Sequence, residues 1–296
     1  MKILVTGGAG FVGTNLVKRL VTNGHEVVVL DDYSTGTKSN HVKGATYYED
    51  DVKWISSWFS FTEDIDLIYH LAGLSRIQPS FENPSETFDV NTLGTQRVLD
   101  FARKKGIKVI YAGSSSKHHD PYQSPYAACK YLGEELCKLY KKTYNMDIEI
   151  CRFYNVYGPH EVIEGDWAAV IGIWRRQVEE GTPITIVGDG EQKRDFTHVY
   201  DIVDALLELE SVNSGLSLLD AWELGTGINY SINEVADMFV KYGGATKTYI
   251  DDQNGNYRET LRESDEALNL LDWSPSDRLE DYIKSLYKGK QLKLDL

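Results

Sequence analysis

The sequence predicts an α/β fold in which a doubly wound parallel sheet is joined to a smaller α+β domain. Three observations predict it. Apolar, β-branched runs alternate with amphipathic stretches through the first half of the 296 residues. A glycine-rich turn follows the first of these runs directly. After about residue 154 the alternation loosens, and glycines and turn signals become more frequent.

The first half of the chain supplies the predicted sheet. Short runs rich in Val, Ile and Leu predict buried strands at 2–6, 26–31, 66–71, 108–113 and 147–153. Amphipathic stretches predict helices at 10–23, 84–105 and 124–144. We therefore expect a sheet domain over 1–154 and a second domain over 155–296, with some segments returning to the first.

Composition and charge limit the classes of function. Hydrophobic residues make up 42% of the chain and charged residues 26%, as in ordinary globular proteins. The formal net charge of −14 disfavours nucleic acid and anionic membranes as partners. No apolar run approaches the ~20 residues of a membrane span, and Gly7 follows the first residue too closely for a secretory signal. We expect a cytoplasmic location.

The cysteines do not predict a metal site. Cys129, Cys137 and Cys151 are odd in number and lack the spacing of metal ligands. We expect three reduced, structural thiols and no bound metal.

A glycine-rich turn marks the predicted cofactor site. Gly7, Gly10 and Gly13 are spaced as Gly-x-x-Gly-x-x-Gly between the first strand and a helix that begins near Phe11 and Val12. Glycine permits the tight turn and lets the backbone approach a pyrophosphate, and the helix N-terminus attracts the phosphate charge. The pattern predicts a Rossmann-like dinucleotide site. A glycine-rich turn without a ligand is the alternative.

Acidic residues after the second strand favour NAD as the dinucleotide. Asp31 and Asp32 stand about twenty residues after the glycines, where a carboxylate can accept hydrogen bonds from the adenosine ribose. A carboxylate there also repels a 2′-phosphate, so NAD is favoured over NADP. Asp51 and Val52 are expected at the adenine, although a solvated turn carboxylate is the alternative for Asp51.

Tyr126 and Lys130 form the predicted catalytic pair. Their i, i+4 spacing puts the phenol and the ammonium on one face of a helix. A nearby cation favours the phenolate, so Lys130 is expected to lower the pKa of Tyr126. The preceding strand ends in Ser114-Ser115-Ser116, at the edge where ligands bind in open α/β sheets. A hydroxyl there can polarise a substrate oxygen.

Several motifs together resemble the extended short-chain dehydrogenases. They include Thr6 to Gly13, His70-Leu71-Ala72-Gly73, Asn91 to Thr95, Tyr126-x-x-x-Lys130, Arg152 to Pro159, Gly188-Asp189-Gly190, Arg194 to Val199 and Leu271 to Pro275. The resemblance covers nearly the whole chain. It is strongest to UDP-glucose 4-epimerase-like members of the NAD-dependent epimerase/dehydratase family.

This resemblance implies roles for individual residues. Tyr126 would be the general base, Lys130 its electrostatic partner and Ser116 the hydroxyl that polarises the substrate oxygen. Further contacts to NAD would come from Leu71, Ala72, Gly73, Asn91 and Phe153. Contacts to the nucleotide sugar would come from Ser115, Asn155 and Arg194. A guanidinium can hold a phosphate through two hydrogen bonds, which suits Arg194, although a salt bridge to a neighbouring Asp is the alternative.

Three features depart from the family pattern. The loop between Ser116 and Tyr126 is short, which leaves the assignment among the three serines open. His118 and His119 stand in that loop and are new. Gln253 replaces an arginine that relatives carry, and Arg258 is expected to take over its phosphate contact.

The predicted reaction is 4-epimerisation of a nucleotide sugar, most simply a UDP-hexose, by transient oxidation at C4 with tightly bound NAD. Relatives that eliminate water or carbon dioxide carry acids beside the catalytic hydroxyl, whereas Lys117-His118-His119 follows Ser116 here. The alternatives are a keto-sugar reductase similar to GDP-fucose synthase, a dehydratase, and a catalytically silent dinucleotide-binding module. Relatives pair the helices that match 84–105 and 124–144, so a homodimer is expected.

Overall fold

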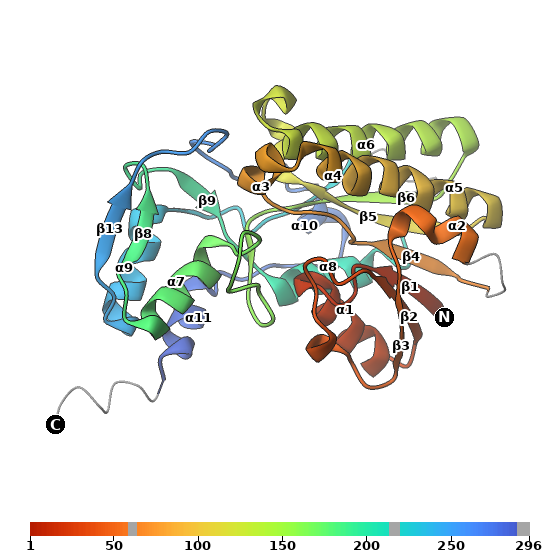
Figure 1. Cartoon of the computed structure of the whole chain (residues 1–296). Coiled ribbons are helices and arrows are strands. Elements are labelled where there is room, and N and C mark those ends of the chain that lie inside the picture. The colour runs from red at the N-terminus through yellow and green to blue at the C-terminus, as the bar shows by residue number, and fades with distance from the viewer. Residues whose placement is uncertain (59–63, 213–219, 289–296) are drawn as a thin grey trace.

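A seven-stranded parallel sheet forms the centre of the computed structural model, which describes residues 1–58, 64–212 and 220–288 (Figure 1). Its strands lie in the order β11-β6-β5-β4-β1-β2-β3, and every neighbouring pair is parallel. Their bounds are β1 Lys2–Thr6, β2 Glu26–Asp31, β3 Ala45–Glu49, β4 Leu67–His70, β5 Lys108–Ser114, β6 Ile148–Phe153 and β11 Trp222–Leu224. The expected doubly wound sheet is confirmed.

Helices cover both faces of this sheet, which explains why its strands are continuously apolar. On one face α1 (Phe11–Thr22) and α8 (Val199–Glu208) pack over Ile3 and Val5. On the other, α5 (Thr95–Lys105) and α6 (Pro125–Tyr144) cover Leu4. A short helix, α2 (Ile55–Trp58), packs against α5.

The helix expected over 84–105 is built from three pieces. It comprises α4 (Pro84–Phe88), six π-helical residues (Asp89–Gly94) and α5. A further helix, α3 (Ile77–Glu82), precedes it and is separated from it by Asn83. The segment between β4 and α3 therefore lies beside the π-helical turns, whose Asn91 hydrogen-bonds it.

A second core lies beyond the carboxyl ends of the sheet strands (Figure 1). It packs α7 (Val170–Glu180), α9 (Ile232–Gly243) and α11 (Leu279–Leu286) around the parallel pair β8 (Ile184–Val187) and β13 (Lys247–Ile250). Smaller pairs join β7 (Val156–Tyr157) to β10 (Thr197–His198) and β9 (Lys193–Asp195) to β12 (Asn229–Ser231). The last short helix is α10 (Glu266–Leu270).

The chain crosses more than once between the two cores. After residue 154, β11 pairs with β6 at the edge of the large sheet, and α8 packs against α1. Trp273, near the C-terminal end, is buried in the same core as Ile3 and Val5. The second half of the sequence therefore contributes to both cores.

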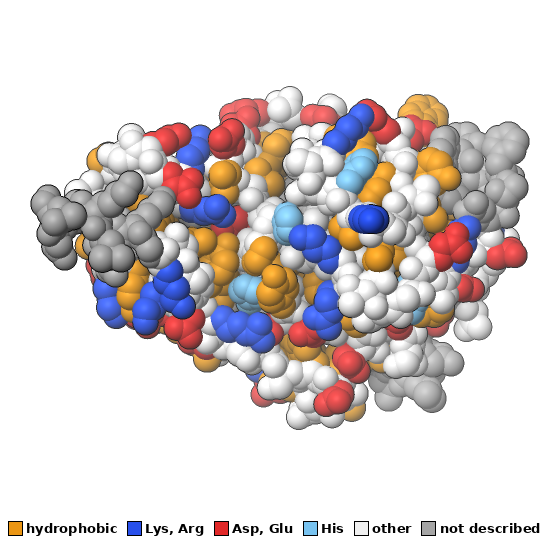
Figure 2. Space-filling model, turned by 90° about the horizontal axis from the view of Figure 1, so that it is seen from below, with side chains coloured by type: hydrophobic (Ala, Val, Ile, Leu, Met, Phe, Trp, Pro, Cys, Tyr) orange, Lys and Arg blue, Asp and Glu red, His pale blue; other side chains and the backbone are white. Residues whose placement is uncertain are grey.

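The surface carries charges of both signs. On the face shown in Figure 2, Lys and Arg side chains lie among Asp and Glu, and hydrophobic side chains form only small groups. Within the described ranges, no helix combines the length and the apolar character needed to cross a bilayer.

Candidate functional site

A cavity of about 760 Å³ lies at the carboxyl ends of the sheet strands and extends between the two cores. Its walls include the glycine turn after β1, the segment after β4, the end of β5 and the start of α6. The second core contributes the segment before α7 and residues near β9 and β13. The cations among its lining residues are Arg76, Lys130 and Arg194.

The glycine turn is shaped for close approach. Gly7 has a φ of +73°, and a Cβ built on it would lie 2.7 Å from the backbone nitrogen of Ala72. A Cβ on Gly13 would lie 2.1 Å from the carbonyl oxygen of Gly7. Gly7, Gly10, Phe11, Val12 and Gly13 all line the cavity. The N-terminus of α1 therefore faces this space with no side chain at its cap, as a phosphate site requires.

Asp31 and Asp32 lie at the same end of the cavity. Asp31 accepts hydrogen bonds from the backbone nitrogens of Ala9, at 2.8 Å, and Tyr33, at 2.9 Å. Burial raises its pKa, and these hydrogen bonds partly offset that rise. Asp31 thus holds the glycine turn in place and also faces the cavity.

Three residues expected at the cofactor are placed differently from one another. Val52 lines the cavity, whereas Asp51 caps the turn that follows it and pairs with Lys53 at 3.1 Å. Asp51 does not line the cavity; its neighbour Asp50 does. Asn91 does not line it either, because its side-chain amide is buried and bonds to both backbone groups of Leu74. Leu71, Ala72, Gly73 and Phe153 all line the cavity.

Tyr126 and Lys130 both line the cavity from the first turns of α6. Ser124 caps this helix by accepting a hydrogen bond from the backbone nitrogen of Ala127, at 3.1 Å. The Tyr126 hydroxyl donates to Ser114 Oγ at 3.3 Å. The Lys130 ammonium donates to the carbonyl oxygen of Ala112 at 2.9 Å.

No hydrogen bond joins the Ser116 side chain to Tyr126 in the described structure. β5 runs through Ser114, one residue further than expected, and the next residues turn away in a short 3₁₀ helix. Ser116 Oγ is buried and has no hydrogen-bond partner in the described structure, while its backbone nitrogen donates to Ser114 Oγ at 3.2 Å. The geometry therefore favours Ser114, rather than Ser116, as the hydroxyl beside Tyr126. Ser115 and Ser116 still line the cavity.

The electrostatics of the tyrosine differ from the sequence expectation. Burial raises the pKa of Tyr126, and the Ser114 hydrogen bond and the charge of Arg76 lower it. Burial also lowers the pKa of Lys130 to about 8, an effect that Glu134 opposes. The ammonium of Lys130 is committed to a backbone carbonyl, and Arg76 is the cation that acts on the phenol.

The expected phosphate ligands separate into two groups. Asn155 and Arg194 line the cavity. Asn155 donates to the carbonyl oxygen of Asp195 and to Thr260 Oγ1, and Arg194 donates to Asn256 Oδ1 at 2.6 Å. No carboxylate in the described ranges pairs with Arg194. Arg258 lies outside the cavity lining, because it is exposed and pairs with Asp189 at 2.9 Å.

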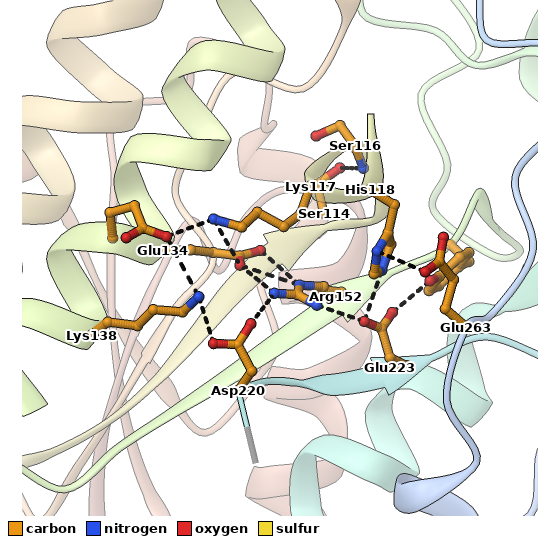
Figure 3. Close-up of polar contacts among 12 residues, drawn as sticks. Ser114, Ser116, Lys117, His118, Glu134, Lys138, Arg152, Asp220, Glu223 and Glu263 are labelled. Atoms are coloured by element: carbon orange, nitrogen blue, oxygen red, sulfur yellow. Dashed lines mark hydrogen bonds and ion pairs between the residues drawn. The ribbon is translucent and has the colours of Figure 1, made fainter. Parts of the chain in front are cut away.

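His118 belongs to a network of ion pairs behind the serines (Figure 3). Its Nε2 lies 2.8 Å from Glu223 and its Nδ1 lies 3.2 Å from Glu263. Arg152, at the centre, pairs with Glu134, Asp220 and Glu223 at 2.7 to 2.8 Å. The network ties the loop after β5 to α6, β6 and β11.

The two histidines are therefore not free loop side chains. The hydrogen bond to Glu223 raises the pKa of His118, which favours the protonated ring. His119 stacks on Tyr257, with ring centroids 3.8 Å apart, and Tyr257 lines the cavity. Through these contacts, both histidines stabilise the loop after β5 beside the cavity.

Sequence reasoning missed Arg76 and Tyr257, which line the cavity. Arg76 stands three residues after Gly73, at the end of the His70-Leu71-Ala72-Gly73 motif, so its distance from that motif is a signal in the sequence. Tyr257 lies in a segment without strong periodicity and gives no comparable signal.

The residues fit a dinucleotide at one end of the cavity. The glycine turn leaves room for a pyrophosphate, and the two aspartates lie where a ribose would be bound. These features match the expected NAD site.

Comparisons with known proteins agree with this geometry. A profile of the NAD dependent epimerase/dehydratase family matches residues 3–215. The chain is 33% identical to a putative UDP-glucose 4-epimerase of Methanocaldococcus jannaschii, over 95% of this chain and 96% of that protein.

Solved structures show the same fold. UDP-glucose 4-epimerase of Thermotoga maritima, with UDP-glucose, has a TM-score of 0.89 at 27% identity and full coverage of both chains. UDP-glucuronic acid 4-epimerase of Bacillus cereus, with UDP-glucuronic acid and NAD, has a TM-score of 0.84 at 27% identity, covering 99% of this chain and 100% of that one. The chain thus belongs to the NAD-dependent epimerase/dehydratase family, and its cofactor is NAD.

Proposed function

We propose that the protein inverts the configuration at C4 of a nucleotide-linked hexose, with UDP as the nucleotide. The observation that carries the proposal is the pair Tyr126 and Ser114, whose hydroxyls lie 3.3 Å apart in the cavity that also holds Lys130 and the glycine turn. The similarity to UDP-sugar 4-epimerases over nearly the whole chain supports the same reaction class.

The chain's own residues would handle the proton of the C4 hydroxyl. Ser114 would hydrogen-bond the C4 oxygen, and Tyr126 would take its proton and later return it; the hydrogen bond between the two hydroxyls supports these roles. Lys130 holds its ammonium beside Gly73, with which it lines the cavity, where it can bind a cofactor hydroxyl. When bound, NAD would supply the redox chemistry of the reaction, which is reversible transfer of a hydride from C4.

Ligand binding is expected to change the protonation of Tyr126. Burial disfavours the phenolate of Tyr126 in the ligand-free cavity, and Arg76 opposes that effect. The positive charge of NAD's nicotinamide ring would favour the phenolate further. Tyr126 would therefore gain its basicity only in the loaded site.

The residues beside Ser114 support epimerisation over elimination. Loss of water needs a base at C5 and an acid at the leaving oxygen. Ser115 and Ser116 follow Ser114, and neither can serve as a carboxylic acid. Return of hydrogen to C4 needs no further group.

Arg194 and Asn155 are proposed to bind the diphosphate of the substrate. Burial lowers the pKa of Arg194 to about 10, and no carboxylate within the described ranges neutralises it. An anionic ligand would restore that balance. Arg258 is not included, because Asp189 already neutralises it at the surface.

A homodimer is also proposed. Leu132 and Leu139 are exposed and lie seven residues apart, on one face of α6. Burying such a face against a second copy would remove it from water.

The function is tested by incubating the purified protein with UDP-, GDP- and dTDP-linked hexoses and hexuronates and identifying products by NMR. The expected result is a mixture of one UDP-sugar and its C4 epimer, without added cofactor. A product that has lost water or carbon dioxide, or consumption of NADPH with a keto-sugar, would instead support a dehydratase, a decarboxylase or a reductase.

A further inference from the structure

Arg76 is a partly buried cation that forms no ion pair within the described structure. It follows β4 and stands immediately before α3, in the cavity wall. No carboxylate in the described ranges lies within ion-pair distance of it. Burial lowers the pKa of Arg76, and Tyr126 and Glu161 only partly oppose this. A guanidinium so placed is unfavourable unless an anion joins it.

The only hydrogen bond of the Arg76 side chain to the described residues orients it. Its Nε donates to the carbonyl oxygen of Trp167 at 3.1 Å, across the cavity wall from its own segment. The two terminal nitrogens donate to no residue in the described parts of the chain. These nitrogens form a planar fork of the kind that binds a carboxylate through two parallel hydrogen bonds.

Arg76 and Arg194 line the cavity from different parts of the fold. Arg76 stands immediately before α3, which packs against α6. Ser80 of α3 accepts a hydrogen bond from the backbone nitrogen of Tyr126 at 3.1 Å, so the segment that carries Arg76 lies beside Tyr126. The charge of Arg76 also lowers the pKa of Tyr126. Arg194 has Tyr257 as its electrostatic partner and lies on β9, in the second half of the chain. The cavity therefore has two cationic positions, one on the segment that packs beside Tyr126 and one on β9.

The chemistry of a hexose distinguishes what these positions can bind. If Tyr126 meets the oxygen on C4, then C6 is only two bonds away from C4, whereas the diphosphate is attached at C1 across the ring. A cation on the segment beside Tyr126 can therefore reach a group on C6. Arg194, on β9, is the cation left for the diphosphate.

We infer that Arg76 binds a carboxylate at C6 of the sugar, so that the substrate is a nucleotide-linked hexuronate rather than a neutral hexose. The inference rests on the proposed function, since it uses the position of C4 at Tyr126. Glu161 does not compete for Arg76, because it accepts a hydrogen bond from Tyr282 at 3.0 Å and forms no ion pair with Arg76.

The test measures the affinities of the NAD-loaded protein for UDP-glucuronate, UDP-glucose and UDP by calorimetry. The wild-type protein is expected to bind UDP-glucuronate about 30-fold more tightly than UDP-glucose, the size expected for a hydrogen-bonded charge pair. Arg76→Gln is expected to remove this difference and to leave the affinity for UDP within about threefold. Arg76→Lys keeps the charge without the fork and should retain only part of the preference.

Arg194→Gln is the matched control, because it should weaken all three ligands together. Equal wild-type affinity for the two sugars would overturn the inference without any variant. A loss of UDP affinity in Arg76→Gln equal to its loss of UDP-glucuronate affinity would also overturn it, because Arg76 would then bind the diphosphate. If wild-type protein binds UDP but does not distinguish the sugars, only this inference fails; if it binds none of the three, the proposed UDP-sugar function fails as well.

Discussion

Two opposing influences act on the phenol of Tyr126. Burial raises its pKa, while Ser114 and Arg76 lower it. The sequence placed Tyr126 and Lys130 correctly on one helix, because i, i+4 spacing alone determines that. It could not show that Lys130 would donate to the carbonyl of Ala112, or that a cation from another segment would act on the phenol.

The choice among three consecutive serines also depended on the structure. All three have the same chemistry, and only the end of β5 decides which hydroxyl faces Tyr126. The sequence predicted that the strand ends at 113, one residue too early. Ser116 lies in the short 3₁₀ helix that follows the strand, and no hydrogen bond joins its Oγ to Tyr126.

The serine assignment predicts unequal effects of two alanine substitutions. Ser114→Ala should lower kcat about 100-fold, because it removes the hydroxyl that bonds Tyr126 and would hold the substrate oxygen. Ser116→Ala, the matched control, should change kcat less than about threefold, since its Oγ has no partner in the described structure. Steady-state rates of C4 inversion measure both. The reverse order would return the catalytic role to Ser116.

At the scale of elements, the sequence predicted the interior strands well and the irregular ones poorly. β1 and β2 match their expected bounds because every residue after the first is buried. β3 was missed, since this edge strand is half exposed and shows no apolar run. β11 has only three residues, too few for a periodic pattern. The long helix over 84–105 was expected, but its π-helical turns were not.

The loop after β5 is short, and ion pairs to distant segments fix its position. Its His118 lies between Glu223 and Glu263, and Arg152 links the same network to α6 (Figure 3). Both glutamates lie more than a hundred residues after His118 in the sequence, so no local sequence pattern could indicate these ion pairs. The loop is anchored by charge.

The segment before α7 contains an acid whose ionisation opposes folding. Glu161 is 8% exposed, and burial raises its pKa to about 7. The folded state therefore binds this proton more tightly than the unfolded chain does, and the free energy of unfolding falls as pH rises from about 4.5 to about 7.

Glu161→Gln should remove that loss. At pH 8 the variant should be more stable than the wild-type protein by about 2 kcal/mol, whereas at pH 4.5 the two should be nearly equal. Urea unfolding at the two pH values measures the difference. Glu164→Gln, at an exposed position nearby, should change neither value. A variant that is less stable at pH 8 would mean that the ionised Glu161 stabilises the fold.

At the scale of the whole molecule, the doubly wound sheet explains why residues from four segments meet. The carboxyl ends of β1, β4 and β5 lie at one edge, and the second core covers that edge. The sequence predicted this edge from the alternation of strands and helices. It could not predict which residues of the second half face the cavity, because that half has short strands and irregular connections.

The proposed homodimer gives a prediction at this scale. Replacing Leu132 and Leu139 together by Asp should halve the mass in solution, because the face of α6 would then carry charge into the contact. Analytical ultracentrifugation measures this. Val240→Asp on α9, also exposed, is the control and should leave the mass unchanged. A wild-type protein that sediments as a monomer would refute the proposal.

The most direct test of the account follows the hydrogen on C4. The UDP-sugar that turns over fastest is prepared with deuterium at C4, converted in ordinary water and analysed by NMR. The inverted product is expected to keep its deuterium at C4, and reduced NAD should not accumulate in proportion to product. Tyr126→Phe is expected to form no product. Replacement of the deuterium by solvent hydrogen in the inverted product, or undiminished inversion by Tyr126→Phe, would contradict it.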